Sequence, residues 1–234
     1  MERYIVNYNP VDITRDFLQG LDWDIIELPI EVDVDKLLDW YNTIVLAYPQ
    51  LEFSFFDNPY IKTEFLPDSQ GMHGYSKKLY GSISSWGIDW PAETDLPIPP
   101  PFAALPEFYP ELFDKSPYSI QAKYNIGYFK ELIDKFGYDA FRYSRITKHD
   151  PGAGILGHVD GVAPALRLHI PIISNDGSKF LFGENLERSY TFNAGKVYIL
   201  NASVWHSTEN TKAMRAHIIS DPPFNKIAEL VGAN

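Results

Sequence analysis

The second half of the chain alternates apolar and polar residues with the two-residue period of β-strands. Turn-forming sequences separate these runs at 175–177, 183–185 and 193–195. Short strands divided by such turns are typical of a sandwich or barrel. The pattern predicts strands at 140–147, 155–159, 165–173, 179–182, 188–193, 196–201 and 214–220.

The first half instead contains apolar residues at helical spacing. A strand is expected at 25–30, followed by a helix that Asp33 or Asp35 caps and that ends before Pro49. The apolar side of this helix consists of Leu37, Leu38, Tyr41, Ile44, Val45 and Tyr48.

A second helix is predicted from Pro117 to Phe136. Ser116 is a suitable N-cap, proline is favoured at the first helical position, and Gly137 ends the pattern. The apolar positions that define it are Ile120, Tyr124, Tyr128, Leu132 and Phe136.

Residues 86–110 have a different composition, with two tryptophans and seven prolines. Because proline lacks a backbone N–H and fixes φ, the segment is interpreted as an irregular arm. We expect this arm to close over a substrate, or else to pack as a surface strap. His73, between glycines, is interpreted as a turn residue.

These elements predict an α+β protein with a mainly β core. We expect an N-terminal helical and irregular cap at 1–138, packed on a β-core at 139–234 as one compact unit.

Two predicted strands have an apolar face and a cationic face. Arg167 and His169 alternate with aliphatic residues, and Arg215 and His217 repeat this arrangement 48 residues later. Such an arginine is often a salt-bridge residue at a rim. Two of them beside a metal site would suit a dicarboxylate, because guanidinium binds carboxylates through two hydrogen bonds.

The residues that suggest a metal site are His158, Asp160 and His206. In an extended segment a His-x-Asp spacing places both side chains on one side, and a more distant histidine can join them from another strand. Two imidazoles and one carboxylate are the ligands of non-haem Fe(II) oxygenases. A lone His-x-Asp is also compatible with a polar turn.

Five blocks in order resemble a known family. They are Thr147–Gly152, His158 with Asp160, Arg167-Leu-His169-Ile-Pro, Gly195–Asn201, and His206 followed by Arg215-x-His217. Across about residues 142–221 the chain resembles the aspartyl/asparaginyl β-hydroxylase and proline hydroxylase family of Fe(II)/2-oxoglutarate-dependent dioxygenases.

The resemblance implies a double-stranded β-helix, the cupin-like jelly roll. It implies that His158, Asp160 and His206 bind Fe(II), and that Arg215 pairs with the distal carboxylate of 2-oxoglutarate. Arg167 and His169 match groups near the other end of that co-substrate. Thr147 occupies a position where a hydroxyl also contacts it.

Asp160 distinguishes between branches of the family. The aspartyl/asparaginyl branch leaves this ligand position to water, whereas the free-proline branch has a carboxylate there, as this chain does. A carboxylate ligand also leaves no position for a halide, which favours hydroxylation over halogenation.

Composition narrows the choice of partners. Residues 1–70 contain 14 acids and 4 bases, whereas 141–234 contain 8 acids and 10 bases. The acidic surface argues against nucleic acid, and the basic half suits an anionic co-substrate. Without cysteine, thiolate metal sites are excluded. No signal peptide or long apolar run is visible, so we expect a cytoplasmic protein without membrane contact.

The sequence therefore predicts an Fe(II)/2-oxoglutarate-dependent hydroxylase. It would oxidise an aliphatic C–H of a proline-, asparagine- or aspartate-like amino acid or peptide side chain with O₂, releasing succinate and CO₂, and ascorbate is expected to stimulate it. Arg142 or Arg145 could hold a substrate carboxylate. The alternatives are a cupin-like metal- or acid-binding protein without turnover, a nucleic-acid demethylase of the same chemistry, and a metal-free jelly roll. The oligomeric state stays open.

Overall fold

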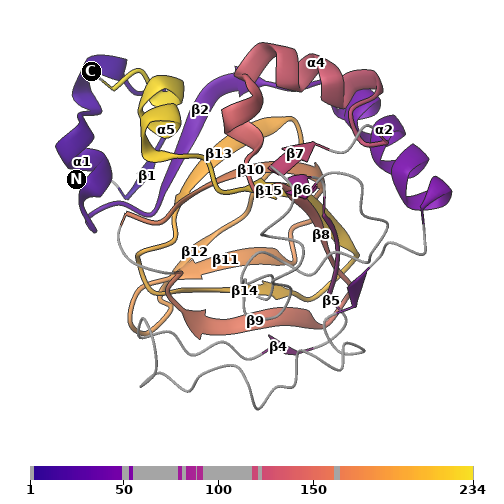
Figure 1. The fold of residues 1–234 in the computed structure, drawn as a ribbon. Helices are drawn as coiled ribbons and strands as arrows, with labels where there is room; N and C mark the ends of the chain where they lie inside the picture. Colours follow the sequence, from indigo (N-terminus) through magenta and orange to yellow (C-terminus); the bar gives the residue numbers. More distant parts are fainter. Residues whose placement is uncertain are drawn as a thin grey trace.

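Two facing β-sheets with helices on one side make up the protein (Figure 1). The structure is a computed structural model, which describes residues 3–48, 53–54, 79–80, 83–87, 89–91, 118–120, 123–160 and 164–233. Within these ranges no helix has both the length and the apolar character needed to cross a bilayer.

Eight strands of the second half form a jelly roll. One sheet contains the order β13-β10-β15-β8 and the other the order β12-β11-β14-β9, so the chain crosses repeatedly from one sheet to the other. The predicted jelly-roll fold is confirmed. The strands are β8 (Arg145–His149), β9 (Ala153–His158), β10 (Leu166–Ile173), β11 (Ser178–Phe182), β12 (Arg188–Tyr190), β13 (Lys196–Asn201), β14 (His206–Asn210) and β15 (Arg215–Ser220).

Strands of the first half extend both sheets. Next to β13 lie β2 (Ile25–Glu31) and β1 (Tyr4–Ile5), and next to β8 lie β5 (Ile83–Gly87) and β3 (Phe53–Ser54). Strand β4 (Leu79–Tyr80) pairs with β9 in the other sheet. The strand predicted at 25–30 is confirmed, and the division of the chain at 138/139 stays a prediction.

Helices α2 (Val34–Ala47) and α4 (Gly127–Phe136) cover the outer face of the eight-stranded sheet (Figure 1). The indole of Trp40 stacks on Phe129 at 4.6 Å, and the outward-facing Leu168 and Ile170 of β10 belong to the same buried cluster. This layer removes the apolar side of β10 from water, which leaves its polar side for the space between the sheets.

Short helices close the remaining end. Helix α1 (Arg15–Gln19), the 3₁₀ helix η1 (Pro10–Asp12) and helix α5 (Phe224–Val231) lie together, and the Arg15 side chain contacts Asn225 and the ring of Phe224. Thr14 caps α1 by accepting a hydrogen bond from the Phe17 N–H.

The helix predicted at 34–48 is confirmed, and Asp33 is its N-cap. The start of the second helix was predicted wrongly, because α4 begins at Gly127 rather than Pro117. Gly127 has φ of +53°, and Tyr118–Ile120 forms strand β7, paired with β6 (Asp89–Pro91). The backbone turn at 123–127 separates the strand from the helix. Gly137 ends the helix as expected.

One predicted strand needs correction, and one strand was missed. The strand expected at 140–147 begins only at Arg145, since residues 138–141 form the 3₁₀ helix η4 (Tyr138–Phe141). Strand β14 was not predicted, because its sequence is polar throughout and has no apolar alternation. It is nevertheless held between β11 and β9 by backbone pairing.

The irregular arm proposed for 86–110 is partly wrong. Trp86 and Gly87 belong to β5, which pairs with β8, and 89–91 form β6. Pro91 is tolerated because it ends one of the two edge strands of a two-stranded sheet. Residues 92–110, and with them the predicted closure over substrate, lie outside the described residues, as does His73.

Candidate metal centre and anion cavity

A cavity lies between the two sheets of the jelly roll, and each sheet contributes different chemistry to it. The sheet that contains β9 and β14 supplies two imidazoles, whereas the opposite sheet supplies three guanidinium groups and further histidines. The empty space in the cavity is about 520 Å³, a figure that includes open solvent. The lining residues are Arg145, Thr147, His149, Ile155, His158, Arg167, His169, Phe180, Leu200, His206, Thr208, Arg215 and Ile219.

His158 and His206 are direct cross-strand partners in neighbouring strands. Their ring centroids lie 4.3 Å apart and both side chains are buried. The register between β9 and β14 shifts next to this pair, since Thr208 pairs with Ile155. The resulting bulge allows both Ile155 and His158 to face the cavity, a common use of bulges near sites.

The ring orientation of both histidines is fixed from behind. Nδ1 of His158 lies 2.8 Å from the Leu156 carbonyl oxygen, and Nδ1 of His206 lies 2.8 Å from that of Val204. A carbonyl can only accept, so each Nδ1 carries the proton and donates. Each Nε2 is therefore left with a lone pair, the state in which imidazole binds a metal.

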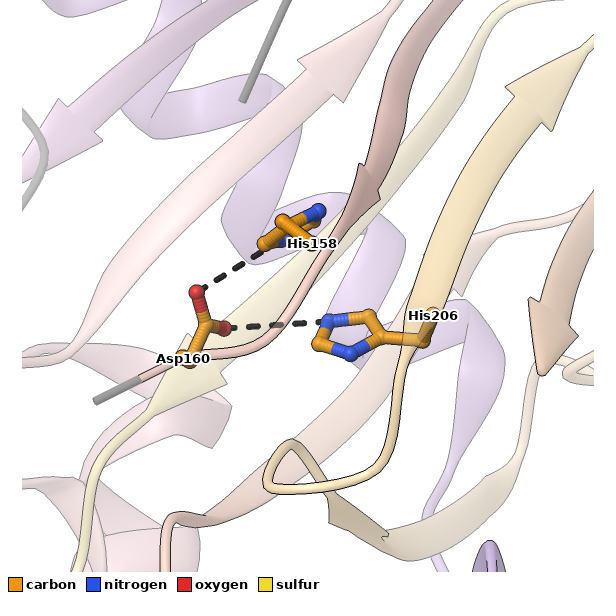
Figure 2. A group of neighbouring side chains, drawn as sticks. All are labelled: His158, Asp160 and His206. Atoms are coloured by element: carbon orange, nitrogen blue, oxygen red, sulfur yellow. Dashed lines mark ion pairs between the residues drawn. The ribbon is translucent and has the colours of Figure 1, made fainter. Parts of the chain in front are cut away.

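Asp160 completes the group just beyond β9. Its backbone N–H donates to the Ala202 carbonyl at 2.8 Å, which ties the residue to the chain that leads into β14. Its carboxylate faces both imidazoles, with Oδ1 3.5 Å from His158 Nε2 and Oδ2 3.8 Å from His206 Nε2 (Figure 2). One ligand atom from each residue falls within 4.8 Å of the others.

The Gly157 backbone is packed tightly against Trp205. A Cβ at this position would lie 2.5 Å from the indole Nε1, far closer than atoms can approach. The two residues precede His158 and His206, so this close packing holds the ends of both strands together.

Two arginines beside the group of His158, Asp160 and His206 share one carboxylate, that of Asp221. Arg167 Nη1 lies 2.6 Å from Asp160 Oδ2, and Arg167 Nε lies 2.9 Å from Asp221 Oδ1. Arg145 Nη1 donates to Asp221 Oδ2 at 3.3 Å. Burial lowers the pKa of Arg145 to about 10, so it stays cationic at neutral pH. For Arg167 the carboxylates of Asp160 and Asp221 outweigh burial and raise the pKa.

The third arginine, Arg215, is also buried between the sheets. Arg215 donates to Ser178 Oγ at 3.2 Å and lies 3.1 Å from Nδ1 of His149, its cross-strand partner. The guanidinium also stacks over the ring of Phe180 at 4.9 Å. Burial, and next the charge of Arg215, hold the pKa of His149 well below its usual value, so this imidazole is a neutral acceptor.

Thr147, His169 and His217 lie on strands of the same sheet, and the first two line the cavity. His169 meets Phe180 and Phe192 edge-on, and burial lowers the pKa of both His169 and His217 strongly. Within the described residues, Nδ1 of His169 has no hydrogen-bond partner.

The structure brings the predicted site residues together from five strands. Asp160 faces His158 and His206, which line the same cavity as the four residues expected to hold the co-substrate, and their functional roles stay predictions. Arg145 lines the cavity, whereas Arg142 is not among its lining residues. His217 packs between the sheets against Phe180 and is not among the lining residues.

Three residues around the cavity were missed from the sequence. His149 could have been found, because Arg145, Thr147 and His149 alternate on one face of a strand. Ser178 and Asp221 stand at the ends of β11 and β15, and neither has a periodic or motif signal.

Residues 113–222 match the sequence profile of the aspartyl/asparaginyl β-hydroxylase family. The predicted resemblance is confirmed. The matched range contains all seven predicted site residues and every strand of the jelly roll. A comparison of the whole sequence with curated proteins gave no match.

Solved structures show distant similarity. An oxidoreductase of the 2-oxoglutarate/Fe(II) oxygenase family from Burkholderia pseudomallei is 15% identical, with 94% of this chain and 93% of that chain covered and a TM-score of 0.42. A prolyl hydroxylase from Trichoplax adhaerens, solved with a hypoxia-inducible-factor peptide, is 10% identical over 94% and 91%, with a TM-score of 0.45. For a conserved protein of unknown function from Streptococcus pyogenes, the alignment covers 34% of this chain and 63% of that chain at 14% identity and a TM-score of 0.28.

Proposed function

We propose that this protein is an Fe(II)/2-oxoglutarate-dependent dioxygenase that hydroxylates an aliphatic C–H bond. The observation that carries the proposal is the group of His158, Asp160 and His206, in which both imidazoles are fixed with Nε2 facing the carboxylate. Two histidines and one carboxylate bind Fe(II) on one face and leave other positions open. The family match of residues 113–222 supports the same chemistry.

The residues fit a dianionic co-substrate as well as a metal. Bound iron, with 2-oxoglutarate and O₂, would supply the oxidation, with succinate and CO₂ as the other products. Arg215 would bind the distal carboxylate of 2-oxoglutarate, because it is a buried residue of the cavity lining and guanidinium binds carboxylate in a planar fork. Thr147 would donate its hydroxyl, and Arg167 and His169 would lie near the end that faces the metal.

The protein would also exclude water from the reaction. The apolar residues of the cavity lining are Ile155, Phe180, Leu200 and Ile219. Electrostatic attraction between the arginines and an anion is stronger in such a site than in water. We propose a proline-, asparagine- or aspartate-like amino acid or peptide side chain as substrate, which needs no membrane or nucleic acid partner.

The proposal is tested by metal uptake and turnover together. The purified protein should bind one Fe(II) per chain under anaerobic conditions. With 2-oxoglutarate, ascorbate and O₂ it should form succinate in the presence of one member of a panel of free amino acids and matching peptides. His206→Ala and Asp160→Asn should lose iron uptake and turnover, because two remaining ligands hold a divalent ion poorly. Asp134→Asn, an exposed change on α4, is the matched control and should behave as wild type.

The outcomes separate the proposed function from its nearest alternative. Stoichiometric iron uptake without 2-oxoglutarate turnover across the panel would favour a cupin-like metal-binding protein. Wild-type iron affinity in His206→Ala would show that the metal ligands lie elsewhere.

A further inference from the structure

Asp221 follows β15 directly and is held firmly by its backbone. Its N–H donates to the Arg142 carbonyl at 2.9 Å, and Pro222 and Pro223 come next in the chain. A residue before proline is restricted to extended conformations. The side chain is 27% exposed, so it stands at the border between the cavity wall and solvent.

Each oxygen of this carboxylate contacts a different arginine of the cavity wall. Oδ1 lies 2.9 Å from Arg167 Nε, and Oδ2 accepts a hydrogen bond from Arg145 Nη1 at 3.3 Å. The two arginines come from β10 and β8, which lie on either side of β15 in the sheet. A single carboxylate thus fixes two guanidinium groups that would otherwise repel each other.

The ion pairs continue to the metal centre. Arg167 uses Nε for Asp221 and Nη1 for Asp160, whose Oδ2 lies 2.6 Å away. Because guanidinium is planar and rigid, fixing Nε also fixes the direction of Nη1. The exposed fraction of the side chains is 27% at Asp221, 17% at Arg167 and 10% at Asp160, so the ion pair nearest the metal centre is the least screened by solvent.

We propose that Asp221 is a positioning residue of the metal centre, which acts through Arg167 to hold the Asp160 carboxylate in its ligand orientation. The inference rests on the proposed metal site. It assigns Asp221 no contact with metal, co-substrate or substrate. Residues that orient a metal ligand from behind commonly change metal affinity when they are replaced.

Charge and geometry both predict that removal of the Asp221 carboxylate weakens metal binding. Without the Asp221 carboxylate, Arg167 loses its fixed orientation, so a mobile cation remains next to Asp160. It can then compete with a metal for that ligand. The expected result is weaker binding of a divalent cation.

The test measures metal affinity without turnover. Chelator-treated protein is titrated with Co(II), a spectroscopic substitute for Fe(II), and binding is followed by visible absorption and calorimetry. Asp221→Asn, which keeps the shape and removes the charge, should bind Co(II) about 10- to 100-fold more weakly than wild type. Asp221→Glu should recover most of the affinity. Asp134→Asn removes an equal charge from an exposed ion pair on α4 and should leave the affinity unchanged.

A double-mutant cycle tests the route through Arg167. In an Arg167→Gln background, Asp221→Asn should change Co(II) affinity by less than about 3-fold, because its intermediary is gone. In an Arg145→Gln background the full loss should remain. A melting temperature measured for each metal-free variant separates loss of fold from loss of affinity.

The possible outcomes distinguish this inference from the proposed function. Wild-type protein that took up no Co(II) at all would overturn the proposed function, and this inference with it. If wild type binds Co(II) and Asp221→Asn binds it equally well, the inference alone is overturned. An equally large loss in the presence and absence of Arg167 would also overturn it, since Asp221 would then act by another route.

Discussion

Arg215 is the residue whose chemistry is most specific in the cavity. Its two terminal nitrogens meet two neutral groups, the Ser178 hydroxyl and the His149 ring, while its plane covers Phe180. Lysine keeps the charge but has no planar fork, so it cannot hold this orientation. A lysine at position 215 therefore tests whether co-substrate binding depends on the positive charge alone or also on the planar shape of guanidinium.

Arg215→Lys should raise the apparent KM for 2-oxoglutarate by about 10-fold or more. This follows if roughly 1.5–3 kcal/mol of charge-assisted hydrogen bonding is lost. Succinate formation measured against 2-oxoglutarate concentration gives the value. Arg15→Lys, at an exposed site on α1, is the matched control and should leave the KM unchanged. An unaltered KM in Arg215→Lys would place the co-substrate clamp at another residue.

Strand β10 combines core and site within one element. Leu168 lies between Arg167 and His169 in sequence, yet it faces the helices while they face the cavity. Its 1% exposure places it fully in the core cluster beneath α2 and α4. Packing on this outer face thus fixes where the two site residues point.

Leu168→Ala should lower the free energy of unfolding by about 2–5 kcal/mol, because it removes buried methyl groups and leaves a cavity. Urea denaturation measures the change. Leu46→Ala is the same substitution at an 80% exposed position of α2, and there a change within about 0.5 kcal/mol is expected. If both variants lost a similar amount of unfolding free energy, packing on the outer face of β10 would contribute no more to stability than an exposed position does.

The elements that the sequence predicted best are those with one apolar side. Residues 165–173 and 214–220 show their period clearly, because one face packs on helices and the other is polar. Strand β14 was missed because its inward face carries His206 and Thr208 rather than apolar residues. The predicted site residues come from β8, β9, β10, β14, β15 and the turn after β9. Residue chemistry and spacing suggested the metal ligands and the two arginines, and the family resemblance added Thr147 and the role of each residue.

Contacts between distant residues were beyond the reach of sequence reasoning. Asp221 forms ion pairs with Arg145 and Arg167, which lie on two other strands, and no spacing in the sequence predicts these contacts. The helix start at Gly127 was missed for a local reason, since the apolar spacing continues through a segment that the backbone breaks with positive φ.

At the scale of the whole molecule, the fold buries basic groups inside an acidic protein. The chain has a net charge of −11, whereas the cavity holds three arginines together with His149 and His169. Burial raises the free energy of charged imidazole, and the guanidinium groups raise it further. The jelly roll is thus expected to require neutral histidines in its interior.

This requirement makes stability dependent on pH. The pKa values of His149, His169 and His217 are all lowered well below 6.5, first by burial and then by neighbouring arginine or histidine. Above about pH 7 these groups are neutral in both folded and unfolded chains. As the pH falls below about 6.5, the unfolded chain takes up protons that the folded chain excludes, so the free energy of unfolding falls.

Urea denaturation of the chelator-treated protein between pH 7.5 and 5.5 measures this effect. The slope should approach roughly 1.4 kcal/mol per pH unit for each of the three histidines, about 4 kcal/mol per pH unit in total, before carboxylates begin to titrate. His217→Gln removes one titrating group from between the sheets and should reduce the slope by about a third, whatever it does to stability at pH 7.5. A free energy of unfolding that stayed constant down to pH 5.5 would mean that these imidazoles are protonated within the fold, and the interior would then have to stabilise their charge next to Arg215.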